Sequence, residues 1–402
     1  MQLDYGVMRA PARLIFGPGQ RKALGRAAAS LGSRALICTD TRLANSPLMQ
    51  ELLDDLAAHD VSVEVFDGTE PELPLEGIRD CVDRHREFRP EVIIGIGGGS
   101  CMDLAKMVSL LMKYPEPVSQ YYGEFKVPGP IVPVIAIPTT AGTGSEVTPV
   151  AVIADSDRAV KVGISSPELI PHTAICDPEL TLSCPAGLTA ISGADAFAHA
   201  LEAFSAIRRP PAPGMAMERV FVGKNVLSDQ YALSAMRLIF ANLEKAVKEG
   251  SDIEARSAVM LGSTYAGLAF GTAGTCAAHA IQYPVGAQTH TAHGLGIGVL
   301  LPYTMEFNVE ACESVYAEVA RAIGVDAGGT DHEAAHAGIA AVRALFQRIG
   351  IPVSLRELDV KDEDLDQIAE LSMGAARLVE NNPRILDKHS VRSILDKAMS
   401  GA

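Results

Sequence analysis

The chain has 402 residues, of which 48% are hydrophobic and 21% are charged, and it contains 36 glycines. This composition excludes a disordered or fibrous protein, and the length predicts about two domains of mixed α/β type. The net charge of −15, from 34 basic and 49 acidic residues without a basic cluster, argues against a nucleic-acid partner.

The seven cysteines are scattered and form no CxxC pair. They predict neither a disulfide framework nor a thiolate zinc site, so we expect a protein of the reducing cytoplasm. A membrane span needs about 18 to 20 apolar residues, and the longest candidate, 131–154, is interrupted by three prolines and Glu146. We therefore expect no membrane partner.

The first 180 or so residues alternate short β-branched runs with amphipathic stretches. The runs 34–38, 61–66, 91–96 and 131–137 predict buried strands, and 43–59 and 75–85 predict helices between them. Strands that alternate with helices predict a parallel sheet with right-handed crossovers.

Asp40 follows the first predicted strand. A carboxylate at this place could accept hydrogen bonds from a ribose diol and repel a 2′-phosphate. An N-cap for the next helix is an equally good interpretation on local grounds.

Two glycine-rich segments follow later strands. In IIGIGGGSCMDLAK (93–106), Gly97, Gly98 and Gly99 allow backbone N–H groups to approach a ligand, and the helix that begins near Ser100 favours an anion such as a pyrophosphate. The segment lacks the GxGxxG fingerprint, so a purely structural turn is the alternative. IPTTAGTGSEVTPVAVI (137–153) holds four threonines and a serine, whose hydroxyls could bind ribose or phosphate.

After Cys184 the sequence changes to long segments rich in Ala and Leu with helical spacing. They predict helices over 188–206, 228–248, 253–269, 310–323, 331–349 and 362–373. We therefore predict an α/β domain over 1–184 and an all-α domain over 185–402. RRPPAPG (208–214) predicts an extended surface loop.

Candidate metal ligands lie in two segments of the second half. Asp195 and His199 are four residues apart on a predicted helix, so they project from one face; an ordinary hydrogen bond between them is the alternative. His279, His290 and His293 lie within fifteen residues further on. Imidazoles with one carboxylate form a ligand set suited to Fe(II), Zn(II) or a similar ion.

HEAAH (332–336) matches the H-E-x-x-H pattern of zinc metalloproteases. Its context favours an ordinary helix start, with Asp331 as the N-cap and Glu333 as a first-turn acid. A peptidase would also leave the two glycine-rich loops without a role.

Taken together, GGGSCMDLAK, IPTTAGTGSE, DAFAHALEA and the two histidines fourteen residues apart resemble the motifs of the iron-dependent (group III) alcohol dehydrogenases, which include lactaldehyde and propanediol oxidoreductases. The resemblance covers nearly the whole chain. It implies a dehydroquinate synthase-like fold with an N-terminal dinucleotide-binding α/β domain, a helical C-terminal domain and a divalent metal in the cleft between them.

The resemblance also implies site residues by position. The metal ligands would be Asp195, His199, His279 and His293. The dinucleotide would lie against Gly98, Gly99, Ser100, Asp103, Thr139, Thr140, Thr143 and Ser145. Lys161 matches a lysine that contacts the cofactor near the reacting centre, and Asp40 matches the acid associated with NAD rather than NADP.

The activity that the resemblance implies is the NAD(H)-linked interconversion of a small alcohol and its aldehyde or ketone by hydride transfer. As a hypothesis, the metal acts as a Lewis acid that lowers the pKa of the alcohol. We expect Fe(II), with Zn(II) or another divalent ion as the alternative, and a homodimer or larger homo-oligomer. The competing hypotheses are a dehydroquinate synthase-like lyase and a non-catalytic nucleotide-binding protein.

Three features depart from the family pattern. Tyr283 replaces a second histidine that many members carry four residues after the third ligand, and a phenol with a pKa near ~10 carries protons poorly at neutral pH. His290, three residues before the last ligand, is the candidate replacement; a histidine that merely packs beside the metal is the alternative. In EPELP (70–74), Glu72 or a neighbour replaces a frequent Asn near the cofactor.

The third departure is the segment 205–229, which is longer than the usual connection. Its basic residues Arg208, Arg209 and Lys224 could bind an acidic aldehyde, but we favour their interpretation as solvated surface charges.

Overall fold

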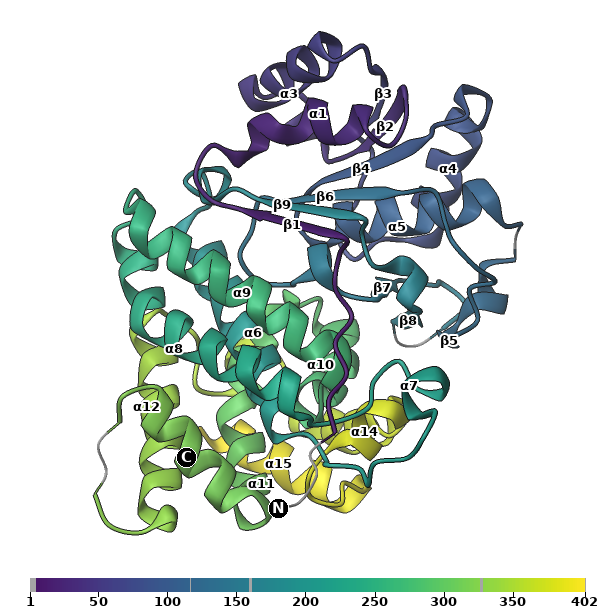
Figure 1. Ribbon diagram of the computed structural model, residues 1–402. Coiled ribbons are helices and arrows are strands. Elements are labelled where there is room, and N and C mark those ends of the chain that lie inside the picture. The colour runs from purple at the N-terminus through teal and green to yellow at the C-terminus, as the bar shows by residue number, and fades with distance from the viewer. Residues whose placement is uncertain (1–4, 116, 159–160, 326–327, 402) are drawn as a thin grey trace. The chain divides into compact units, whose positions relative to one another are not determined.

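The computed structural model describes residues 5–115, 117–158, 161–325 and 328–401. It divides into two compact units (Figure 1). The α/β unit comprises Arg9–Ser183 and Met217–Val220; the helical unit comprises Cys184–Ala216, the chain from Phe221 onward and the N-terminal segment that ends at Met8. The division into two domains over 1–184 and 185–402 remains a prediction.

Six parallel strands form the main sheet of the α/β unit, in the order β1-β9-β6-β4-β2-β3. They are β1 (Arg13–Phe16), β2 (Arg34–Cys38), β3 (Ser62–Phe66), β4 (Val92–Gly97), β6 (Val134–Pro138) and β9 (Thr173–Cys176). The central strands β4 and β6 are buried along their whole length, which explains their continuous apolar sequences. A smaller sheet pairs β5 (Gly123–Glu124), β8 (Val162–Ser165) and β7 (Val150–Ile153).

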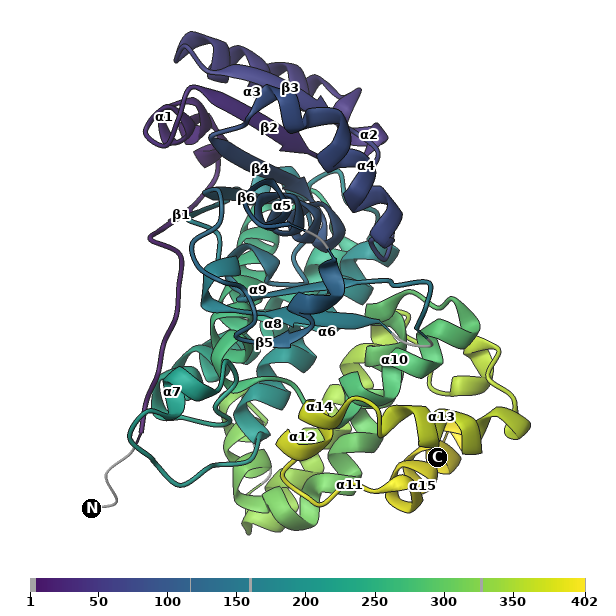
Figure 2. The same cartoon turned by 90° about the vertical axis from the view of Figure 1, so that its right-hand side faces the viewer.

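Helices cover both faces of the main sheet (Figure 1, Figure 2). They are α1 (Leu24–Ala29), α2 (Thr41–Ala44), α3 (Pro47–Ala58), α4 (Leu75–His85) and α5 (Gly99–Lys113). Successive strand residues point to opposite faces. Accordingly, Ile37 packs with Leu52 of α3, whereas Leu36 packs with Ile78 of α4 and Leu104 of α5.

The helical unit contains α6 (Ala186–Ser205), α8 (Val226–Lys248), α9 (Ile253–Ala273), α10 (Ala277–Thr289), α11 (His293–Ala322), α12 (Asp331–Arg348), α13 (Leu365–Ser372), α14 (Ala376–Asn381) and α15 (Lys388–Ser400). Helix α6 packs against α8, α9 and α11, and every residue from Gly193 to Ser205 is buried. A Cβ on Gly193 would lie 2.2 Å from a methyl carbon of Leu243, so a residue without a side chain is needed for this close packing. No helix within the described ranges is long and apolar enough to cross a membrane.

The predicted fold class, an α/β unit with an all-α unit, is confirmed. Individual elements differ from the predictions. The predicted helix 43–59 is two helices, because Ser46 accepts a hydrogen bond from the backbone N–H of Met49 and Pro47 occupies the first position of α3. Helix α10 and the first half of α11 were not predicted, and α7 (Met215–Glu218) lies in the loop 205–229.

The first two glycines after Ile96 give a test of local packing. Gly97 has φ of +146°, and a Cβ there would lie 2.5 Å from Cys101 Sγ. Gly97→Ala is therefore expected to lower the free energy of unfolding by about 1 to 3 kcal/mol. Gly98→Ala is the matched control, because φ is −77° and the nearest atom, in Thr140, is 3.8 Å away. Urea unfolding measures both; equal losses in the two variants would contradict this prediction.

Candidate functional site

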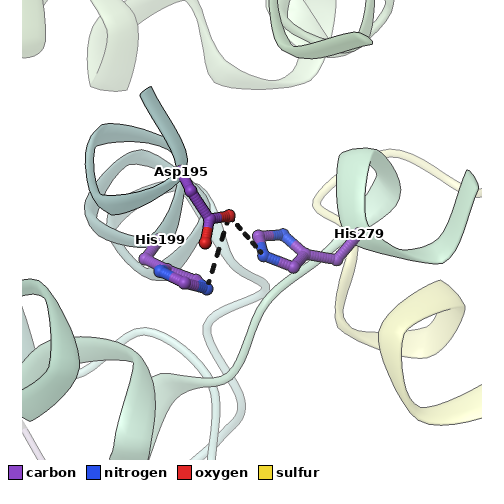
Figure 3. Close-up of side chains that lie close together, drawn as sticks. All are labelled: Asp195, His199 and His279. Atoms are coloured by element: carbon purple, nitrogen blue, oxygen red, sulfur yellow. Dashed lines mark ion pairs between the residues drawn. The ribbon is translucent and has the colours of Figure 1, made fainter. Parts of the chain in front are cut away.

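Four polar residues of the helical unit gather from three helices, two from within α6 and one from the start of each of α10 and α11. Asp195 and His199 lie one turn apart on α6, His279 lies in the first turn of α10, and His293 is the first residue of α11. Figure 3 shows Asp195, His199 and His279 with their side chains pointing toward one another. Because α6 is buried on all sides here, its polar groups must find partners inside the protein.

Three imidazoles surround one carboxylate oxygen. The Nε2 atoms of His279, His293 and His199 lie 3.6, 3.8 and 3.9 Å from Asp195 Oδ1. These distances exceed those of hydrogen bonds. They are close to the ~3.4 Å that separates two ligand atoms bound at ~2.1 Å to a tetrahedral ion. The ligand atoms of Asp195, His199 and His279 all lie within 4.8 Å of one another, and His293 joins this group through Asp195.

The unpaired atoms of this cluster fit a divalent metal. Asp195 Oδ1 and His279 Nε2 are buried and have no hydrogen-bond partner within the described residues. Burial raises the pKa of Asp195, but the charges of His199 and His293 and the contact with His279 outweigh it and hold the pKa well below its usual range. A buried, ionised carboxylate without compensation costs several kcal/mol. One cation among the three imidazoles and the carboxylate satisfies all of these groups, and the ligand set suits Fe(II) or Zn(II).

A second buried carboxylate, Glu202, holds His279 in place. Glu202 Oε2 accepts hydrogen bonds from His279 Nδ1 at 2.6 Å and from the backbone N–H of Cys276 at 2.9 Å, and Oε1 accepts one from Ala278 N–H at 2.7 Å. Burial lowers the pKa of His279, but Glu202 and Asp195 outweigh it and raise the pKa to about 9. With Nδ1 protonated, Nε2 is directed toward Asp195. Carboxylates commonly orient metal-binding histidines in this way.

The glycine-rich loops of the α/β unit meet at the carboxyl ends of β4 and β6. A Cβ on Gly99 would lie 2.8 Å from Thr143 Cγ2, and Thr140 is the nearest residue to a Cβ on Gly98. Strand β4 continues through Gly97 into α5, whose N-terminal N–H groups can receive an anion. The chain runs from β2 outward to β3 and returns to β4, so the strand order reverses between β2 and β4. Open parallel sheets bind ligands at such a point.

Comparison with known proteins identifies the family. A family model described as "Iron-containing alcohol dehydrogenase" matches residues 11–178, and "Fe-containing alcohol dehydrogenase family, C-terminal" matches residues 189–399. The chain belongs to the iron-containing alcohol dehydrogenase family. It is 33% identical to an NAD-dependent methanol dehydrogenase of Bacillus methanolicus, over 97% of this chain and 98% of the relative. It is 34% identical to a sulfoacetaldehyde reductase of Bilophila wadsworthia, over 96% of each protein.

Solved structures of other proteins agree with this family assignment. A crystal structure of 1,3-propanediol oxidoreductase superposes with a TM-score of 0.92 at 32% identity and covers 98% of this chain and 100% of that chain. The predicted family, fold and reaction class are therefore confirmed, as is the predicted cofactor pair of a divalent metal and NAD(H) at the level of the family. The family assignment favours a dehydrogenase over the lyase and the non-catalytic alternatives.

In this alcohol dehydrogenase family member, Tyr283 and the candidate proton carrier His290 lie in different surroundings. The ring of Tyr283, one turn after His279, stacks at 6.2 Å from the ring of His293. His290 ends α10 with a left-handed backbone at φ of +56° and is exposed. Its imidazole makes no ring contact or ion pair with the metal cluster in the described part of the chain. The role of His290 stays a prediction.

Asp40 is the N-cap of helix α2, which was the alternative interpretation of this residue. Its Oδ1 accepts a hydrogen bond of 2.8 Å from Leu43 N–H and caps α2, while Oδ2 lies 3.9 Å from Arg42. The residue is half-buried at the carboxyl end of β2, at the point where the strand order reverses. Capping leaves Oδ2 at this edge of the sheet, so a ribose contact stays a prediction.

Two predicted cofactor residues of the enzyme form an internal network. Asp103 Oδ1 accepts a hydrogen bond from Ser145 Oγ at 2.5 Å, and Oδ2 accepts one from Val152 N–H at 2.9 Å. Lys106, which is fully buried, donates to Ser145 Oγ and to the carbonyl of Val150 at 2.8 and 2.7 Å. Burial lowers the pKa of Lys106. This network fastens the threonine-rich loop to α5, and sequence analysis missed Lys106 although it lies three residues after Asp103.

The remaining cofactor candidates also have protein partners. Thr143 Oγ1 accepts a hydrogen bond of 3.3 Å from Ser145 N–H, and the backbone N–H of Thr139 donates to Gly97 at 2.9 Å. Lys161 Nζ lies 2.8 Å from Oε1 of Glu72, a residue of the EPELP segment. Glu72 has a left-handed backbone at φ of +67°. The pair therefore places a negative charge beside the predicted cofactor lysine.

The prediction of solvated charges on the loop 205–229 is wrong for Lys224. Its Nζ donates to Asp229 at 2.8 Å and to the carbonyl of Phe204 at 2.7 Å, and its side chain is 11% exposed. Arg208 lies 3.5 Å from the same carboxylate. Because Asp229 is shared by both cations, the loop offers less positive charge to an acidic aldehyde than its sequence suggests.

The HEAAH segment is the ordinary helix start that its context predicted, with one correction. Thr330, rather than Asp331, is the N-cap of α12, and Asp331 is the first helical residue. Glu333 is the first-turn acid that was predicted: its Oε2 accepts a hydrogen bond of 2.8 Å from Thr330 N–H in a capping box. A carboxylate held in this way is not positioned as the general base of a peptidase.

Glu202 supplies a test of how the metal cluster is held. Glu202→Gln is expected to lower metal affinity about 10- to 100-fold, because an amide cannot accept hydrogen bonds on both arms and no longer polarises His279. Competition with a chelator measures the affinity. Glu363→Gln, at an exposed position, is the matched control. Unchanged affinity in Glu202→Gln would show that this carboxylate only caps α10.

Proposed function

We propose that this enzyme interconverts small alcohols with their aldehydes or ketones, using NAD(H) and a divalent metal, Fe(II) in its native form. The observation that carries the proposal is the convergence of three imidazole Nε2 atoms on Asp195 Oδ1, a buried oxygen without a hydrogen-bond partner in the described residues. Membership of the iron-containing family and an NAD-dependent relative support it.

Asp195, His199, His279 and His293 would hold the metal. When bound, the metal supplies Lewis-acid polarisation of the substrate oxygen and lowers the pKa of an alcohol. The protein keeps the ligands ready. Phe270 stacks on His199 with ring centroids 4.2 Å apart, and Glu202 fixes the ring of His279. Both supports limit ring rotation, so the ligand atoms stay directed toward one point.

The α/β unit would bind the dinucleotide, which supplies the hydride acceptor or donor at its nicotinamide ring. The N-terminus of α5, with Gly98, Gly99 and Ser100, would receive the pyrophosphate, and the hydroxyl of Thr140 beside Gly98 supports this. Asp40 would disfavour a 2′-phosphate and so select NAD over NADP. Thr139, Thr140 and Thr143 would line the dinucleotide, whereas Asp103 and Ser145 would shape its loop.

The relatives differ in the charge of the substrates that their names give. One relative is named a methanol dehydrogenase and another a sulfoacetaldehyde reductase. The pairing of Lys224 and Arg208 with Asp229 supports a small neutral alcohol or aldehyde for this enzyme. A panel of neutral and anionic aldehydes with NADH tests this choice.

The oligomeric state and the cellular location are two further parts of the proposal. We infer a homodimer or larger homo-oligomer, supported by the position of β1 at the edge of its sheet, and light scattering after size-exclusion chromatography tests it. We infer a cytoplasmic location, supported by free thiols at all seven cysteines, each of which lies in the described ranges.

Replacement of one ligand tests the metal-dependent reaction. His279→Ala is expected to retain the fold by circular dichroism but to lose the bound metal. It should also lose more than about 99% of NADH-dependent aldehyde reduction, because without Lewis-acid catalysis the transition state loses several kcal/mol of stabilisation. His389→Ala, at an exposed position on α15, should keep both. Wild-type turnover in His279→Ala would refute the ligand assignment.

The proposed proton carrier is tested by pH dependence. His290→Gln is expected to leave metal content unchanged and to alter the pH–rate profile between pH ~5 and ~8, where imidazoles exchange protons. The exposed position of His290 at the end of α10, three residues before His293, supports this role. A profile that is superimposable on that of the wild type would remove His290 from the mechanism.

A further inference from the structure

A second group of histidines lies in the helical unit, on α12, a helix that contributes no residue to the metal cluster around Asp195. A groove of about 740 Å³ runs along α11 and α12. Its lining includes Glu310, Glu313, His332, His336, Arg343 and Lys397. His332 and His336 are the two histidines of HEAAH, and the capping role of Glu333 leaves their imidazoles unexplained.

The two imidazoles have a geometry that can bind one ion. His332 and His336 are four residues apart on α12, so they project from one face of the helix. Their ring centroids are 4.5 Å apart. The metal cluster provides an internal comparison, because the centroids of its histidine pairs are 4.7 and 5.4 Å apart. The exposed pair is therefore spaced as closely as histidines that converge on a common point.

A carboxylate orients the first of these histidines. Glu313 Oε1 on α11 lies 2.7 Å from His332 Nδ1. Glu202 and His279 make the same contact at 2.6 Å in the metal cluster. When Nδ1 donates to a carboxylate, Nε2 carries the lone pair and is the atom available to a cation. The arrangement of carboxylate, imidazole and neighbouring imidazole thus occurs twice in this unit.

The charged residues of the groove do not oppose the binding of a cation beside His332 and His336. Arg343 pairs with Glu306, and Glu310 lies 3.1 Å from Arg384. Lys397 also lines the groove, but Glu313, beside the two imidazoles, contributes the local negative charge. Both histidines are exposed, so water can complete the coordination of an ion.

We propose that His332 and His336 bind a second divalent ion of the borderline class, Zn(II) in the simplest case, with Glu313 as the residue that positions His332. Imidazole ligands suit zinc, nickel and copper, whereas magnesium and calcium require oxygen ligands. Fe(II) lies low in the affinity order for such ligands. The site binds an ion without any chemical step, and it does not depend on the proposed reaction.

Zinc stoichiometry of the full chain tests this site. With the metal cluster already loaded with Zn(II), calorimetric titration with further Zn(II) is expected to show one additional equivalent. His332→Ala and His336→Ala should each weaken that binding at least about tenfold, and Glu313→Gln should weaken it several-fold. His389→Ala, which removes an exposed histidine from another helix, should leave it unchanged.

The outcomes separate clearly. Since both histidines are exposed, thermal melts of the variants should match the wild type, and His336→Gln serves as a second substitution if His336→Ala changes the melt. An absent additional equivalent in the wild type, or one that persists in a variant that lacks both histidines, overturns the proposal. Activity is not a readout here, so failure of the proposed reaction would leave the result interpretable.

Discussion

The metal cluster depends on one buried carboxylate, Asp195. Its Oδ1 atom has no hydrogen-bond partner in the described residues, yet three imidazoles face it at less than 4 Å. Removing a charge from water without compensation costs several kcal/mol, so this arrangement is stable only when a cation balances it. Helices α6, α10 and α11 must all pack correctly before the ligands converge. The site is therefore a product of tertiary packing, held in place by Glu202.

Sequence patterns predicted the elements that carry a clear period. Strand β2 and helix α4 have the predicted bounds, because one is a short, largely apolar and buried run and the other has one apolar face. Helix α10 was missed because it is buried around most of its circumference, so no amphipathic spacing marks it, and because Pro284 interrupts its sequence. Strand β9, four residues long, is defined by its neighbours β1 and β6 rather than by its own sequence.

The site was predictable only in part for a related reason. Helical spacing brings Asp195 and His199 together, but only the family resemblance linked them to His279 and His293, because no local rule relates residues eighty positions apart. Glu202 lies on the same face of α6, seven residues after Asp195, and this spacing could have revealed it. Asp103 and Ser145 turn inward toward Lys106, because a buried ammonium group needs such partners.

Anomalous X-ray scattering at the iron edge, from crystals of protein reconstituted anaerobically with Fe(II), tests the central claim most directly. We predict one strong anomalous peak in the helical unit, from an iron ion bonded at ~2.0 to 2.2 Å to Asp195, His199, His279 and His293. Iron bound at other side chains, with these four residues left without an ion in a protein that still reduces aldehydes, would contradict the assignment of the metal site.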